Sequence, residues 1–228
     1  MDRFRELLAQ GKDVAFVVRK GALTDPPDIK YQNGYTLLRE QVIQHITKVS
    51  GEDPVICTTG KASRELFETR EANGQSHKYD FLTVGSMGHS SSIALGVAVN
   101  KPDQRIWCVD GDGAVLMHMG ALAVIGSMKP SNLIHVVINN SSHESVGGMP
   151  TVSSNIDIAA VAKACGYHYV VSVDSMEDLD SELEKAKNRN ELCLIEVKCQ
   201  IGARSDLGRP TTTPLKNKSD FTGYIQNL

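Results

Sequence analysis

Short apolar runs alternate regularly with helix-like segments from residue 36 to residue 197. Because strands separated by helices pair in parallel and need cover on both faces, this order predicts an α/β fold. We expect a doubly wound parallel sheet with helices on both faces. The expected strands are residues 54–58, 81–84, 105–110, 135–138, 169–173 and 192–197. The expected helices run from Thr36 to about residue 49 and over 61–72, 90–100, 114–125, 157–165 and 175–187.

The first 35 residues do not fit this repeating unit. Residues 4–10 are typical of the end of a helix and residues 14–18 (VAFVV) of a strand, and Pro26 and Pro27 follow in a polar linker. One strand and part of a helix cannot bury a core of their own. We therefore expect 1–35 to be the tail of a preceding domain plus a linker, and 36–228 to be one domain. An extra edge strand on the main sheet is the alternative.

Composition excludes several classes of protein. The net charge is −3 and no segment concentrates Lys and Arg, so the sequence lacks the basic patch that is typical of nucleic-acid-binding and membrane-surface proteins. No apolar stretch reaches the roughly 20 residues that span a bilayer, and the N-terminus lacks a secretory pattern. A cytosolic protein that binds small ligands is expected. The five cysteines lack metal-binding spacing and are interpreted as small buried residues.

One glycine-rich turn stands where a strand ends and a helix begins. Gly111, Asp112, Gly113 and Ala114 follow the run RIWCVD. The glycines allow close backbone approach, and the N–H groups that start the helix can receive phosphate oxygens. Asp112 offers a hard oxygen ligand, and a carboxylate beside a phosphate needs a cation between them. Mg²⁺ suits that arrangement.

A second polar element ends the following strand. Asn140 lies 28 residues after Asp112, and neighbouring strands would bring the two together. Asn140 offers a side-chain carbonyl oxygen and Ser142 a backbone carbonyl. With Asp112 they form an oxygen-only set that matches Mg²⁺ or Ca²⁺.

The Gly-Asp-Gly turn followed by an Asn pair resembles the signature of thiamine-diphosphate enzymes. Within them, the chain is most similar to the phosphonopyruvate decarboxylases, with the sulfopyruvate decarboxylases as near relatives. The segments that carry this resemblance are TTGKASRELFE (58–68), TVGSMGHSSSIALG (83–96), VDGDGAVLMHMGAL (109–122), NNSSHESVGGMPT (139–151) and RSDLGRPTTTP (204–214). Residues 14–21 also resemble the end of that family's pyrimidine-binding domain.

The resemblance implies thiamine diphosphate and Mg²⁺ as cofactors. Met87 lies 25 residues before Asp112, where related decarboxylases place an apolar side chain that holds the cofactor bent. An ordinary core position is the alternative for Met87. The residues that the resemblance assigns to the cofactor are Thr59, Gly60, Ser86, Met87, His89, Gly111, Asp112, Gly113, Ala114 and Asn140.

The implied reaction is the decarboxylation of a three-carbon 2-oxo acid with a terminal phosphonate or sulfonate, which yields an aldehyde and CO₂. His143 and Glu144 are candidates for proton transfer, or else an exposed loop pair. Related decarboxylases place a glutamate where this chain has Val146. Arg204 and Arg209 are candidates for holding the terminal anion, with Lys61 or Arg64 as alternatives and a solvated tail as the other interpretation.

The resemblance also implies a partner. In this family a glutamate on a separate pyrimidine-binding domain activates the cofactor, and this chain has no second domain to carry it. We therefore expect an oligomer with a pyrimidine-binding domain or α subunit, and no turnover by the chain alone. Another thiamine-diphosphate reaction, such as acetolactate synthesis or 2-oxoacid oxidation, and a non-catalytic supporting module are the alternatives.

Overall fold

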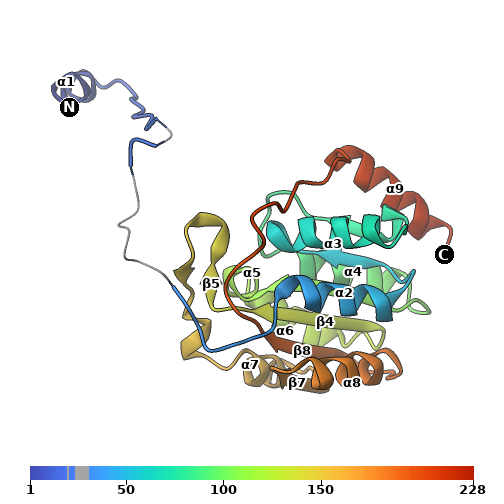
Figure 1. Cartoon of the computed structure of the whole chain (residues 1–228). Coiled ribbons are helices and arrows are strands. Elements are labelled where there is room, and N and C mark those ends of the chain that lie inside the picture. The colour runs from blue at the N-terminus through green and yellow to red at the C-terminus, as the bar shows by residue number, and fades with distance from the viewer. Residues whose placement is uncertain (20, 24–30) are drawn as a thin grey trace. The chain divides into compact units, whose positions relative to one another are not determined.

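The computed structural model describes residues 1–19, 21–23 and 31–228 and divides into two compact units, Met1–Lys30 and Tyr31–Leu228 (Figure 1). The first unit contains helix α1 (Asp2–Ala9). The strand expected at residues 14–18 is wrong, since the described part of this unit offers no second strand to complete a ladder. The predicted linker with Pro26 and Pro27 lies outside the described residues.

The second unit is built on a parallel sheet of six strands in the order β2-β1-β3-β4-β8-β7. Its register pairs Ile56 with Cys108, Cys108 with His135, and His135 with Leu194. The strands are β1 (Val55–Cys57), β2 (Asp80–Leu82), β3 (Ile106–Gly111), β4 (Leu133–Asn139), β7 (Tyr169–Val173) and β8 (Cys193–Lys198). A separate antiparallel pair consists of β5 (Ser142–His143) and β6 (Met149–Pro150).

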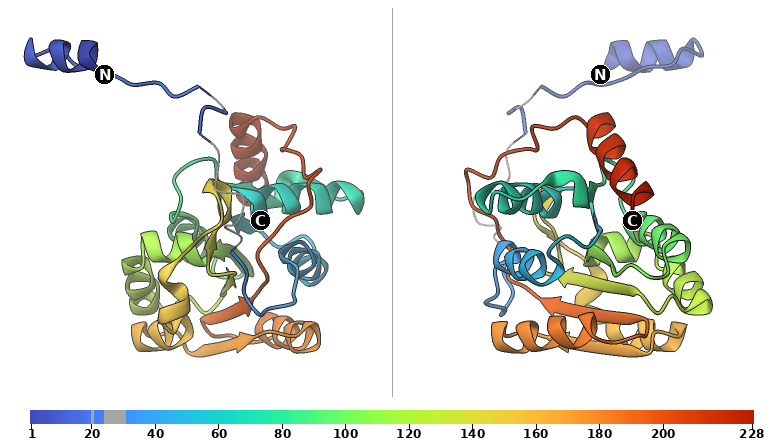
Figure 2. Two further views of the ribbon diagram at one scale, coloured as in Figure 1. Left: turned by 60° about the vertical axis from the view of Figure 1, so that its left-hand side comes forward. Right: turned by 90° about the vertical axis from the view of Figure 1, so that its right-hand side faces the viewer.

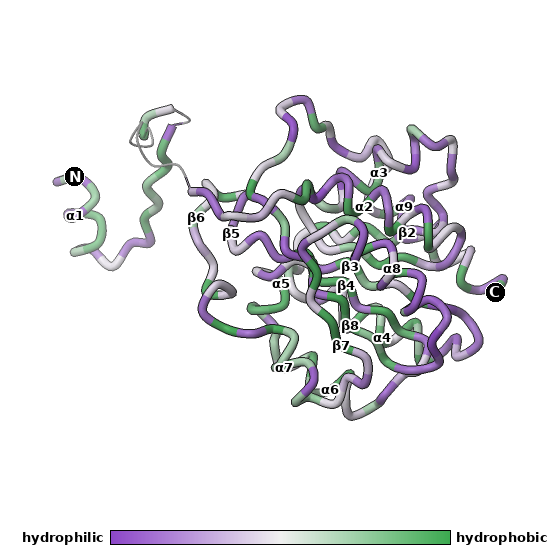
Figure 3. Tube along the Cα trace, turned by 60° about the horizontal axis from the view of Figure 1, so that its bottom comes forward, coloured by the Kyte–Doolittle hydropathy of each residue, from purple (hydrophilic) through white to green (hydrophobic). Residues whose placement is uncertain are grey.

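Helices cover both faces of the sheet, which confirms the predicted fold class (Figure 2). One face carries α2 (Arg39–Ser50), α3 (Lys61–Ala72) and α8 (Met176–Lys187). The other carries α4 (Ser90–Asn100), α5 (Asp112–Met117), α6 (Gly120–Met128), α7 (Ile158–Cys165) and α9 (Pro214–Gln226). Single 3₁₀ turns lie at η1 (His77–Tyr79), η2 (Glu144–Val146) and η3 (Val152–Asn155). Apolar residues gather on the central strands (Figure 3).

Two expected helix boundaries are wrong. The helix expected to begin at Thr36 begins at Arg39, after Leu38 in extended conformation. The helix expected over residues 114–125 is two helices, because His118 leaves the helical conformation between α5 and α6. The His118 ring packs instead on the ring of His89, with centroids 4.1 Å apart.

Capping side chains fix other ends as the sequence indicates. Asp157 accepts a hydrogen bond from the backbone of Ala160 at the start of α7, and Ser175 accepts one from Asp178 at the start of α8. Helix α9 was not expected. It begins after Thr213, whose hydroxyl accepts a hydrogen bond from the backbone of Lys216, so the segment taken as a solvated tail ends in an ordered helix.

Within the described residues, no helix combines the length and the apolar character that crossing a bilayer requires.

Candidate functional site

The strand order places a crevice at the carboxyl ends of β1 and β3. Strand β1 lies between β2 and β3 in the sheet. The chain leaves β1 through α3 to reach β2 on one side of it, and β3, on the other side, leads on to β4 in the opposite direction across the sheet. Such a switch in direction is where open α/β sheets bind ligands. A cavity of about 150 Å³ lies there. It is lined by residues 58–62 after β1, by 110–114 where β3 ends and α5 begins, and by 142–146 after β4, together with Arg39, Met87, Ile138 and Asn140.

Asp112 opens helix α5 at the floor of this cavity and is 3% exposed. Its Oδ2 accepts hydrogen bonds from Thr151 Oγ1 at 2.5 Å and from Ser153 Oγ at 2.8 Å. Burial raises the pKa of the Asp112 carboxyl, although these two hydroxyls oppose the shift. The hydroxyls occupy one carboxylate oxygen, so the other oxygen remains the ligand that the carboxylate can offer.

Asn140 lies opposite, between β4 and β5. Its Nδ2 donates to Glu144 Oε2 at 2.7 Å, and its Oδ1 accepts from the backbone N–H of Ser142 at 3.1 Å. The backbone carbonyl of Asn140 accepts from Asn33 Nδ2 at 2.8 Å. The first two contacts fix the orientation of the side-chain amide, and the third holds the backbone at this position.

The Glu144 carboxylate is the centre of a buried hydrogen-bond network, and only 7% of its side chain is exposed. It accepts from Arg39, from Lys61 Nζ at 3.2 Å, from Asn140 Nδ2 and from the backbone N–H of Gly202 at 2.9 Å. Four donors hold this carboxylate in one orientation. This geometry favours a positioning role for Glu144 over proton transfer, and an exposed loop position is excluded for it.

Arg39 links Glu144 to a second buried carboxylate. Its guanidinium binds Glu65 with both arms, Nε to Oε2 at 2.6 Å and Nη2 to Oε1 at 2.7 Å. Burial alone would lower the pKa of Arg39, but the hydrogen bonds and charges of Glu65 and Glu144 outweigh it and raise that pKa. Burial also raises the pKa of Glu65, and Arg39 opposes that shift. The pair ties α2 to α3 beneath the cavity.

Most of the predicted site residues come together. The cavity wall contains Thr59, Gly60, Met87, Gly111, Asp112, Gly113, Ala114, Asn140, Ser142, His143 and Glu144. Ser86 and His89 do not line it. Both are exposed, and they flank Met87 in a turn where Ser86 has a φ of 44°. The Met87 side chain reaches the backbone of Gly113, since a Cβ built on that glycine would lie 3.2 Å from Met87 Cε.

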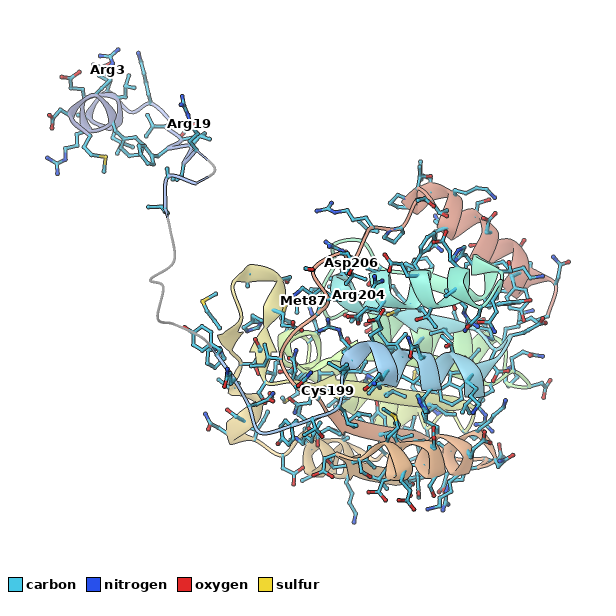
Figure 4. The ribbon with its side chains drawn as sticks, viewed as in Figure 1. Arg3, Arg19, Met87, Cys199, Arg204 and Asp206 are labelled. Carbon is cyan, nitrogen blue, oxygen red and sulfur yellow. The ribbon has the colours of Figure 1, made fainter. Side chains whose placement is uncertain are left out.

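The two arginines predicted to hold the substrate anion lie outside the cavity. Arg204, on the segment between β8 and α9, is surrounded by carboxylates: Nε binds Glu40 at 2.9 Å, Nη1 binds Asp206 at 3.2 Å, and a third contact joins Nη2 to Glu68 (Figure 4). The positive charge of Arg204 is therefore balanced by carboxylates of the same chain. Arg209 is exposed on the same segment. The cavity cations among the described residues are Arg39 and Lys61.

The sequence reasoning missed Arg39, Glu65 and the hydroxyls of Thr151 and Ser153. One signal was present for Arg39. It precedes Val42, Ile43 and Ile46 by three, four and seven residues, so a charged side chain falls on the buried stripe of its helix. Thr151 and Ser153 reach Asp112 from 39 and 41 residues away, and no local pattern marks them.

Comparisons with known proteins agree with this geometry. The family model described as the C-terminal TPP binding domain of thiamine pyrophosphate enzymes matches residues 58–197. Phosphonopyruvate decarboxylase from Streptomyces viridochromogenes is 39% identical over 171 residues, which cover 75% of this chain and 42% of that protein. The chain thus spans less than half the length of this relative.

Two further relatives complete the comparison. Sulfopyruvate decarboxylase subunit beta from Methanocaldococcus jannaschii is 35% identical over 165 residues, 72% of this chain and 80% of that subunit. The crystal structure of benzoylformate decarboxylase from Polynucleobacter necessarius superposes with a TM-score of 0.63 at 16% identity, over 77% of this chain and 35% of that one, and supports the fold. The chain belongs to the thiamine pyrophosphate enzymes and carries their C-terminal TPP-binding domain.

Proposed function

We propose that this chain is the diphosphate- and Mg²⁺-binding part of a 2-oxoacid decarboxylase that converts phosphonopyruvate to phosphonoacetaldehyde and CO₂. The observation that carries the proposal is the convergence of Asp112, Asn140 and Ser142 on one cavity at the carboxyl ends of two adjacent strands. The 39% identity to phosphonopyruvate decarboxylase supports this choice of substrate.

The residues present fit thiamine diphosphate and Mg²⁺. The proposed metal ligands are one oxygen of Asp112, the side-chain oxygen of Asn140 and the backbone carbonyl of Ser142, an oxygen-only set of the kind that Mg²⁺ prefers beside a phosphate. Gly113 leaves the space beside Met87 and His143 open, since a Cβ there would come within 3.2 Å of both side chains. The N–H groups at the start of α5 face phosphate oxygens in this arrangement.

When bound, thiamine diphosphate supplies an electron sink for the loss of CO₂. The chain's own residues orient the reactants and move protons. Met87 would serve as an apolar support for the cofactor. His143, on the cavity wall and only partly buried, is the candidate for proton transfer, and Glu144 positions Asn140.

The terminal anion of the substrate needs a cationic partner at the cavity. Lys61 fits best, because it lines the cavity, its side chain is 31% exposed, and its ammonium contacts one carboxylate, that of Glu144 at 3.2 Å. Arg204 would first have to leave the carboxylates that surround it. We therefore place the substrate anion near Lys61, and keep Arg204 and Arg209 as positions that act only after rearrangement of their segment.

The proposed enzyme includes a pyrimidine-binding domain or α subunit that supplies the activating glutamate, in an oligomer. A second substrate is supported by one observation. The chain covers 80% of the M. jannaschii sulfopyruvate decarboxylase subunit beta, and this division of an enzyme into two chains matches a single cofactor-binding domain. Sulfopyruvate is thus the second candidate substrate.

A turnover assay separates these possibilities. Phosphonopyruvate, sulfopyruvate and pyruvate would each be supplied with thiamine diphosphate and Mg²⁺ to the chain, with and without a candidate pyrimidine-binding chain, and CO₂ release measured. We expect no turnover by the chain alone and the highest kcat/KM for phosphonopyruvate with the partner. Turnover without a partner would refute the shared site, and preference for pyruvate would indicate another thiamine-diphosphate reaction. A partnered complex that binds the cofactor but turns over nothing would favour a supporting module.

A further inference from the structure

A cluster of three metal-ligating side chains lies within the sheet, separate from the proposed Mg²⁺ ligands. Cys108 and Asp110 are two residues apart on β3, so they point to the same face, and His135 is the register partner of Cys108 on β4. All three are buried, with exposed fractions of 0%, 1% and 0%. One ligand atom from each lies within 4.8 Å of the others.

The polar atoms of this cluster lack the partners that buried groups normally have. Within the described chain, Asp110 Oδ2 and His135 Nε2 make no hydrogen bond, whereas Asp110 Oδ1 accepts one from the backbone N–H of Gly111 at 3.0 Å. The Ser90 hydroxyl lies beside the Cys108 thiol. Buried polar atoms without partners are rare, and a water molecule or an ion can satisfy them. Here two of them lie in one cluster with a buried thiol.

The orientation of the His135 ring shows which kind of ligand is missing. Its Nδ1 lies 3.1 Å from Tyr167 Oη, and its Nε2 lies 3.6 Å from Asp110 Oδ2. The second distance is too long for a hydrogen bond. Two ligands on a tetrahedral zinc ion, at bond lengths near 2.1 Å, stand about 3.4 Å apart. Tyr167 Oη can accept a hydrogen bond from Nδ1–H and so fix the ring, and a histidine that binds metal through one nitrogen normally donates its other N–H to such an oxygen partner.

Charge and donor chemistry select the ion. A thiolate, a carboxylate and a neutral imidazole carry two negative charges, which a divalent cation cancels in a buried site. Sulfur and nitrogen donors suit Zn²⁺ and disfavour Mg²⁺. Asp110 also lines the cavity, which gives an ion a path from solvent. The thiol proton leaves to solvent as the metal binds.

We propose that Cys108, Asp110 and His135 bind one Zn²⁺ ion, with the Ser90 hydroxyl or a water molecule as the fourth ligand. The ion joins β3 to β4 directly beneath the turn that carries Asp112. The site does not depend on the proposed decarboxylase activity.

Cobalt substitution tests the site, because thiolate coordination to Co²⁺ gives a near-ultraviolet charge-transfer band that oxygen-only coordination lacks. The full chain would be expressed in minimal medium with Co²⁺, dialysed against excess Mg²⁺, and examined by metal analysis and absorption. Cys57→Ala is the matched control, because Cys57 is equally buried on β1 but packs on the opposite face. Asp112→Ala removes the other candidate metal site.

We expect one Co²⁺ per chain and the sulfur band in the wild type, in Cys57→Ala and in Asp112→Ala. Cys108→Ser should lose the band, and His135→Gln should retain at least tenfold less cobalt. A folded wild-type chain without the band would overturn the proposal, whatever the variants do. The proposal would also be contradicted if Asp112→Ala lost its cobalt and Cys108→Ser kept it, because the ion would then be bound at the cavity.

Discussion

Replacing Arg39 with Met tests whether the buried network below the cavity stabilises the domain as its geometry implies. Both oxygens of Glu65 are bound by this guanidinium, at 2.6 and 2.7 Å, and Glu65 is 2% exposed. Glu144 keeps its other three donors, so Glu65 is the group left charged and unpaired. Breaking such a buried pair costs about 3–5 kcal/mol. With a urea m-value of about 3 kcal/mol/M, the unfolding midpoint should fall by about 1–2 M.

Urea unfolding followed by circular dichroism measures this change. Arg204→Met is the control, since it removes an exposed arginine that also contacts carboxylates and should cost at most about 1 kcal/mol. The double variant Arg39→Met with Glu65→Leu removes both charges and should regain at least about 2 kcal/mol. The reasoning is refuted if Arg39→Met costs less than about 1 kcal/mol, or if the double variant is as unstable as the single one.

Three further results are expected. Gly126→Ala should destabilise the domain by about 3 kcal/mol, because the added Cβ would lie 1.9 Å from a backbone oxygen of α7. The control is Gly120→Ala on the same helix, where the added Cβ has no atom within 4 Å and should stabilise the domain slightly. Equal melting temperatures of the two variants would contradict this expectation. Asp80→Ala leaves the fully buried Arg70 without its carboxylate partner and should cost about 3–5 kcal/mol of unfolding free energy. Asp220→Ala breaks the exposed pair with Lys216 and should cost at most about 1 kcal/mol in the same denaturation assay. Burial raises the pKa of Cys57, Cys193 and Cys199, so at pH 8 these thiols stay protonated, and Cys108 is fully buried in the sheet. Iodoacetamide should therefore label only Cys165 quickly in the folded chain, and a second fast site in mass spectrometry would refute this expectation.

The sequence predicted the sheet well because each strand is a short apolar run between clear boundary signals. Helices with a capping side chain, such as those after Asp157 and Ser175, begin where expected. Errors appear where tertiary contacts decide. His118 breaks a helix in order to pack on His89, and α9 depends on Phe221 packing against Phe81, with ring centroids 5.5 Å apart.

The candidate site could be predicted in part for a similar reason. Its glycine turn and Asn pair are contiguous motifs, and parallel strands bring their ends together. The groups that support these motifs are distant in sequence. Arg39 reaches Glu144 across 105 residues, and Ser153 reaches Asp112 across 41. Arg204 was wrongly predicted as a cavity residue because two of the carboxylates around it, Glu40 on α2 and Glu68 on α3, are distant in sequence and no local pattern reveals them.

The most direct test of the central claim is a calorimetric titration of thiamine diphosphate into the chain, with and without Mg²⁺. Asp112→Ala removes the proposed ligand, and Asp103→Ala removes an exposed carboxylate of the same kind as a control. We expect binding that requires Mg²⁺, survives in Asp103→Ala, weakens at least tenfold in Asp112→Ala and tightens when a pyrimidine-binding partner is added. Binding that is equally strong without Mg²⁺ or in Asp112→Ala would contradict the claim.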